Sequence, residues 1–121
     1  MVGTPPNTMY MDFPSTMIRG PEFIMTALVY NVRALVNGDY NLRWRAILYD
    51  YAQNQFEIVP WTEDYGNSST GEKYIKAVGV SAFTRCPMNA LVGNGARIVV
   101  EVEDITDGRQ TSAKSEPFAI M

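Results

Sequence analysis

The stretch that decides the fold class is residues 23–36, FIMTALVYNVRALV. Read as a helix, it gathers apolar residues on one face: Ile24, Met25, Leu28, Val29, Val32, Leu35 and Val36. Pro21 precedes it and Gly38 follows it, where helices favour these two residues. Read as a strand, it alternates, with Ile24, Leu28, Tyr30, Val32, Ala34 and Val36 set against Asn31 and Arg33. The segment alone therefore leaves helix and strand open.

The residues that follow favour the strand. Asn37-Gly38 is a strong signal for a two-residue β-hairpin turn. Beyond it, Asn41–Asp50 alternates, with Leu42, Trp44, Ala46 and Leu48 on one side and Arg43, Arg45 and Tyr49 on the other. We therefore predict that residues 23–36 are extended and pair with Asn41–Asp50 across the turn. A helix over residues 23–36 would instead make the fold α+β.

The rest of the chain consists of short alternating segments separated by turn signals at intervals of about ten residues. The expected strands are Tyr10–Phe13 at an edge, Gln55–Val59 ended by Pro60, Tyr74–Phe83, Arg97–Glu103 and Ser115–Met121, and Trp61–Glu72 reads as a polar loop. The inward positions of the clearest strands include Trp44, Ile98, Val100 and Phe118. This pattern predicts an all-β fold, an antiparallel immunoglobulin-like β-sandwich. We expect one domain over residues 10–121, behind a flexible leader at residues 1–9.

The C-terminal part supports this architecture by resemblance. The run ARIVVEVED at residues 96–104, the Asp107-Gly108 turn and the run SEPFAI at residues 115–120 resemble the last two strands of many immunoglobulin-like sandwiches. Cytoskeletal, receptor, Rel-type and Runt-type domains end in a similar way. The resemblance covers about 25 residues and implies an architecture rather than one family.

Composition limits the function classes. The chain has 121 residues, no histidine, one cysteine and a formal net charge of −3, from 10 basic and 13 acidic residues. Without histidine it lacks the commonest general base and metal ligand, so we expect neither an enzyme nor a cofactor. The single Cys86 and an N-terminus unlike a signal peptide predict an intracellular setting, cytoplasmic or nuclear. No segment is long and apolar enough for a membrane span, so we expect no membrane partner.

Two acidic clusters, Glu63-Asp64 and the group Glu101, Glu103, Asp104 and Asp107, carry oxygen ligands that calcium accepts. Neither has the spacing of a known calcium loop, and we interpret both as solvated turns and strand faces. We therefore expect no metal site. Cys86 precedes Pro87 in a turn and is interpreted as a small buried apolar group.

The aromatic and arginine residues carry the functional expectation. Exposed Trp, Tyr and Arg side chains are typical of binding hot spots, and the candidate partner-binding residues are Tyr49, Tyr51, Trp61, Tyr65, Arg43 and Arg45. They predict a non-catalytic module that binds another protein through loops or an edge strand.

Three alternatives stay open. An immunoglobulin-like nucleic-acid-binding domain would need Arg43, Arg45, Arg85 and Lys73 to converge on one side. A self-assembling structural subunit, such as a viral one, would bury an edge strand between copies. A carbohydrate-binding module would use the rings of Trp61 and Tyr65.

Overall fold

The computed structural model describes residues 6–33, 39–67, 76–106 and 108–121. This part of the chain is built from strands, turns and loops, and no helix occurs in it. The strands are β1 (Asn7–Asp12), β2 (Thr16–Met17), β3 (Glu22–Val32), β4 (Asp39–Tyr49), β5 (Gln55–Asn67), β6 (Lys76–Arg85), β7 (Gly93–Asp104), β8 (Arg109–Lys114) and β9 (Phe118–Ile120). The predicted all-β class is confirmed.

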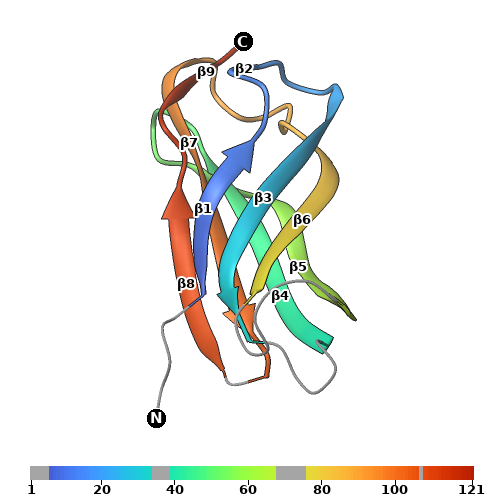
Figure 1. Ribbon diagram of the computed structural model, residues 1–121. Helices are drawn as coiled ribbons and strands as arrows, with labels where there is room; N and C mark the ends of the chain where they lie inside the picture. The colour runs from blue at the N-terminus through green and yellow to red at the C-terminus, as the bar shows by residue number, and fades with distance from the viewer. Residues whose placement is uncertain (1–5, 34–38, 68–75, 107) are drawn as a thin grey trace.

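The strands form two sheets (Figure 1). The smaller sheet has the order β1-β3-β6 and is antiparallel. The larger sheet has the order β2-β9-β7-β4-β5, and β8 also pairs with β7. Its pairs are antiparallel except for β2 and β9, which run parallel. In Figure 1, β1 and β3 lie in front of β7 and β4.

One apolar core lies between the sheets. The predicted inward residues Trp44, Ile98, Val100 and Phe118 are all buried in it, together with residues of the smaller sheet such as Met25 and Val80. Trp44 is the largest fully buried side chain. The prediction that these four residues share one core is confirmed.

β3 is extended, as the strand interpretation predicted, and Val32 is buried as expected, but the inner face of residues 23–30 was predicted wrongly. Ala34 and Val36 lie outside the described residues. Ile24 and Tyr30 are exposed, and the core side of the strand consists of Met25, Ala27, Val29 and Val32. The step from Val29 to Val32 breaks the alternation, because Asn31 adopts a φ of 61° and the register shifts there. Such a bulge moves every later side chain to the opposite face.

The predicted pairing of this segment with Asn41–Asp50 is also wrong. β3 pairs with β1 and β6, whereas β4 pairs with β5 and β7, so the two strands belong to different sheets. Alternation determines which side of a strand is buried, but it does not select the neighbouring strand. The Asn37-Gly38 signal itself lies outside the described residues.

Other boundaries also differ from expectation, since β8 was not predicted and the last strand is Phe118–Ile120 rather than Ser115–Met121. β5 continues through Pro60 to Asn67, so Trp61 and Tyr65 lie on a strand, and the prediction of a polar loop from Trp61 is wrong as far as Asn67. Residues 68–72 of that loop lie outside the described residues. Proline is tolerated at position 60 because β5 pairs only with β4 in the described chain and forms an edge, with register shifts near Pro60. At the other end of the chain, β1 begins at Asn7, inside the range expected to be a flexible leader.

Two buried aspartates hold the ends of the larger sheet. At the end of β4, Asp50 accepts hydrogen bonds from the backbone N–H groups of Ala52, Asn54 and Leu91 and from the side chain of Asn54. At the end of β7, Asp104 accepts from the backbone of Arg33 and Thr106 and from the Arg109 guanidinium. Asp104 is fully buried, so its interpretation as a solvated residue is wrong.

Candidate interaction surface

Five of the six candidate residues lie on the outer face of the larger sheet. Arg43, Arg45 and Tyr49 alternate along β4 with the buried residues Leu42, Trp44, Ala46 and Leu48. Tyr65 on β5 lies opposite Asn41, and Trp61 lies where the register shifts opposite Arg45. The alternation of β4 therefore places its polar residues beside the aromatic residues of β5. We call the surface formed by Arg43, Arg45, Tyr49, Trp61 and Tyr65 the Trp61 face.

Trp61 is held by two arginines. The Arg43 Cζ atom lies 4.4 Å from the centroid of the indole ring, and the Arg45 Cζ atom lies 4.8 Å from it. Both are cation–π distances. Trp61 is 39% exposed and Tyr65 is 71% exposed, so both rings remain available to a partner.

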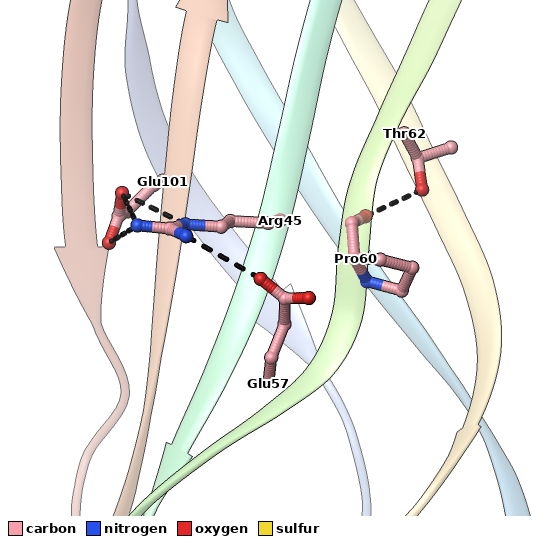
Figure 2. A network of polar contacts seen from close by, with 5 residues as sticks. All are labelled: Arg45, Glu57, Pro60, Thr62 and Glu101. Carbon is pink, nitrogen blue, oxygen red and sulfur yellow. Dashed lines mark hydrogen bonds and ion pairs between the residues drawn. The ribbon is translucent and has the colours of Figure 1, made fainter.

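Each of these arginines is also paired with acidic residues of neighbouring strands. Arg45 donates to both carboxylate oxygens of Glu101 on β7, at 3.0–3.3 Å, and lies 3.5 Å from Glu57 on β5. Figure 2 shows Arg45 between these two carboxylates, with the Thr62 hydroxyl donating to the Pro60 carbonyl on the adjacent strand. The negative charges of Glu57 and Glu101 therefore compensate the positive charge of Arg45.

Arg43 has a similar arrangement. Its Nε atom donates to Glu103 on β7, and Gln110 on β8 donates to the other oxygen of the same carboxylate at 2.8 Å. The hydrogen bond from Gln110 and the ion pair with Arg43 lower the pKa of Glu103, against an opposing effect of burial. Glu103 is therefore a carboxylate at neutral pH, which keeps Arg43 neutralised.

Shallow hollows occur on the Trp61 face. One, of about 240 Å³, lies between Trp61 and β8 and is lined by Glu101, Val102, Gln110, Thr111 and Ser112. Another, of about 230 Å³, is lined by Tyr49, Gln53, Gly95, Arg97, Val99 and Lys114. Both are small for the ligand pockets of enzymes, which run to roughly 300–1,000 Å³.

Tyr51, the sixth candidate, lies apart from this face. It belongs to the turn between β4 and β5, and its ring covers Gly93 at the start of β7. A Cβ atom on Gly93 would lie 2.8 Å from Cδ1 of Tyr51, so the glycine permits this close approach. Sequence reasoning did not find this packing role.

The basic residues required by the nucleic-acid alternative are not gathered in the described part of the chain. Arg43 and Arg45 lie on the larger sheet, whereas Arg85 lies on β6 of the smaller sheet, 3.7 Å from Glu22. Lys73 lies outside the described residues.

Cys86 is buried, and its burial raises the pKa of the thiol against the opposing charge of Arg19. No group of three or more His, Cys, Asp or Glu side chains within the described ranges is placed to hold a metal ion. No helix long and apolar enough to cross a membrane occurs there either.

Comparison with known proteins gives no family model that matches the chain and no curated protein that matches it. A function for the protein therefore has to be inferred from the chemistry of its surface.

Proposed function

We propose that the protein is an immunoglobulin-like sandwich that acts as a non-catalytic protein-binding module, with the Trp61 face as its contact surface. The observation that carries the proposal is the meeting of Arg43, Arg45, Tyr49, Trp61 and Tyr65 on one exposed face. Trp, Tyr and Arg are the residues most enriched in binding hot spots.

The strand order supports the immunoglobulin-like assignment. The first strands divide between the sheets, with β1 in the smaller sheet and β2 beside β9 in the larger one. The last strands, β8 and β9, both pair with β7, and the fully buried Trp44 lies on the central strand β4. Immunoglobulin-like domains likewise bury a tryptophan on a central strand between two antiparallel sheets.

The contacts that position the side chains around Trp61 support a binding role. Association costs conformational entropy for each side chain that becomes fixed, about 0.5–1.5 kcal/mol for a flexible one. The guanidinium groups of Arg43 and Arg45 already lie over the Trp61 ring, and Glu101 and Glu103 already orient them. A partner that contacts this face meets groups whose positions are fixed before binding.

The charge pattern favours a protein over nucleic acid. Nucleic-acid affinity comes largely from Lys and Arg that neutralise phosphates. The two arginines at the centre of the Trp61 face are instead neutralised by Glu57, Glu101 and Glu103. A surface with both signs of charge around aromatic rings suits the mixed surface of another protein.

The ring environment also favours protein over sugar. Sugar stacking favours a fully open aromatic face, and the guanidinium groups of Arg43 and Arg45 already lie over the Trp61 ring, which is 39% exposed. A non-catalytic role agrees with the buried thiol of Cys86, whose raised pKa keeps it protonated.

Affinity capture compared between variants tests the proposal. The test variant is Trp61→Ala with Tyr65→Ala, and the matched control is Tyr10→Ala, which removes an exposed ring from the smaller sheet. Proteins captured from a lysate of the source cells by the wild-type chain should be retained by the control. The captured amount of these proteins should fall at least roughly tenfold with the test variant, because a hot-spot ring contributes about 2 kcal/mol to the binding free energy.

Circular dichroism of the three chains must show the same fold. Equal capture by the test and control variants would overturn the proposal. Nucleic-acid binding is measured separately by gel shift at two salt concentrations, with Arg43→Ala and Arg45→Ala as variants. Tight binding that falls steeply with salt and disappears with these variants would also overturn it.

A further inference from the structure

β6 presents an unprotected strand edge. Within the described residues it pairs only with β3, so the backbone groups along its other edge have no strand partner. Its residues 77–84, AVGVSAFT, contain no charged residue and no proline. Its register with β3 runs without a shift from Arg85 to Val78, so the edge is regular over this length. Edges of this kind readily accept another strand.

Other edges of the sandwich carry the features that prevent such pairing. β5 contains Pro60 and borders two register shifts, and it carries Glu57, Glu63 and Asp64. β1 has a bulge between Thr8 and Tyr10. Bulges, prolines and charges are the usual protections of edge strands. β6 therefore lacks the protections that β1 and β5 carry.

The nearest strand of the larger sheet leaves this edge open. The Thr84 hydroxyl of β6 donates to the Ile58 carbonyl of β5, which links the two strands at one end. Thr84 faces the core, so this contact uses a side chain and not the backbone edge of β6. Figure 1 shows β6 at the margin of the smaller sheet.

The outer face of β6 carries a large exposed ring, Phe83, and a residue without a side chain, Gly79. Phe83 is 71% exposed, although it is a large apolar side chain. Gly79 lies four residues earlier on the same face, and a Cβ atom placed on it would have nothing within 4 Å. Ser81 is exposed midway between them.

We propose that β6 pairs with β6 of a second copy of this chain, antiparallel and about a two-fold axis at Ser81. In this register Ser81 lies opposite Ser81 of the other copy, and each Phe83 lies opposite Gly79 of the other copy. Cross-strand neighbours on one face are in contact, and an aromatic ring over a glycine is a recognised stabilising pair in sheets. Because Phe83 and Gly79 lie on the same strand, two copies of β6 are complementary to each other in this register.

The neighbouring side chains agree with this register. On β3, Ile24 lies opposite Phe83 and Leu28 lies opposite Gly79. Each Phe83 ring would thus extend a row of apolar side chains from Ile24 of its own copy to Leu28 of the other copy. On the core side, Val80 meets Ala82 and Val78 meets Thr84, so the apolar interior also continues. Arg85 lies opposite Ala77, and no like charges face one another along the pair.

The dimer is expected to be weak, because one strand pair and two rings of about 150–250 Å² each form a small interface. It is independent of the proposed function, since β6 and the Trp61 face belong to different sheets. We expect a dissociation constant on the order of 10–100 μM, as for transient interfaces of this size.

Sedimentation velocity over a range of protein concentrations tests the dimer. Wild type should show a rising dimer fraction, and Ser81→Lys should remain monomeric, because it places two lysines opposite each other at the two-fold axis. Thr16→Lys is the matched control, since it adds the same charge at an exposed position on β2 and should dimerise like wild type. A monomeric wild type at several hundred micromolar (about five times the weakest constant expected), or equal dimerisation of the two lysine variants, would refute the proposal.

Cysteine cross-linking tests the register. Under mild oxidation, Ser81→Cys should form an intermolecular disulfide, because the two residues lie directly opposite each other. Ala77→Cys should not, because its neighbour in the other copy is Arg85. Cross-linking of Ala77→Cys but not Ser81→Cys would show that the proposed register is wrong.

Discussion

Replacing Asp104 by Ala is expected to destabilise the fold by about 3–5 kcal/mol, the usual cost of breaking a buried ion pair from one side. The Asp104 carboxylate is fully buried, and Arg109 Nη2 lies 3.1 Å from one of its oxygens. It also accepts the backbone N–H of Arg33 at 2.7 Å and that of Thr106 at 3.1 Å. Alanine would leave these three donors without this acceptor inside the protein.

The hydrogen bond from the Arg33 N–H gives Asp104 a role beyond its own turn. Arg33 follows β3 of the smaller sheet, whereas Asp104 ends β7 of the larger sheet. The carboxylate therefore joins the two sheets at one end of the sandwich. Asp104→Asn keeps the shape and one acceptor oxygen, so we expect it to cost less than Asp104→Ala.

Thermal unfolding followed by circular dichroism measures the effect. A loss of 3–5 kcal/mol corresponds to a fall in Tm of roughly 10–20 °C for a domain of this size. The control is Asp12→Ala, which removes an exposed carboxylate from β1 and should change the Tm little. An Asp104→Ala protein that melts with the Asp12→Ala control would refute the reasoning.

Three further outcomes are expected. Phe118→Ala should cost about 3–5 kcal/mol in urea unfolding, because Phe118 is buried and packs on Phe13 with ring centroids 5.2 Å apart; an unchanged midpoint would contradict its placement. Burial acts to raise the pKa of Asp50, but its hydrogen bonds from Asn54, Leu91 and Ala52 lower it below the ordinary value of 3.8. The stability that the Asp50 carboxylate provides is thus present above pH 3.8 and is lost as the pH falls through its lower folded-state pKa. Asp50→Asn should therefore weaken the pH dependence of Tm below pH 3.8. The same fall of Tm at acid pH in wild type and variant would contradict this. Millimolar calcium should leave the Tm unchanged, because no group of three or more candidate ligands is gathered in the described residues; a rise in Tm would contradict this.

The sequence predicted the class and the core of the fold because both depend on local alternation. Trp44, Ile98 and Val100 occupy inward positions of strands whose period is unbroken, and all three are buried. The same rule failed on β3, since Asn31 introduces a bulge that alternation does not reveal.

The neighbours of each strand could not be predicted in the same way. Asn37-Gly38 suggested that β3 and β4 pair, yet they lie in opposite sheets. Two apolar faces can be buried equally well by pairing side by side or by facing each other across a core. The choice depends on the whole set of strands, which a local turn signal does not contain.

The candidate surface was anticipated in its residues but not in its geometry. Trp61 and Tyr65 were predicted to lie in a polar loop, and the structure places both on β5, with Trp61 against Arg43 and Arg45 and Tyr65 opposite Asn41. The stacking depends on a register shift between β4 and β5, which no residue pattern indicates. The open edge of β6 likewise becomes visible only when the strand order is known.

Site-specific photo-cross-linking tests the proposed function most directly. A photoreactive phenylalanine derivative is placed at Tyr65, on the Trp61 face, and in a second protein at Tyr10, on the outer side of the smaller sheet; both positions are exposed. We expect a discrete adduct with another protein from position 65, lost when Trp61→Ala is added, and no such adduct from position 10. An adduct from position 10 alone, or one at position 65 that survives Trp61→Ala, would contradict the proposed function.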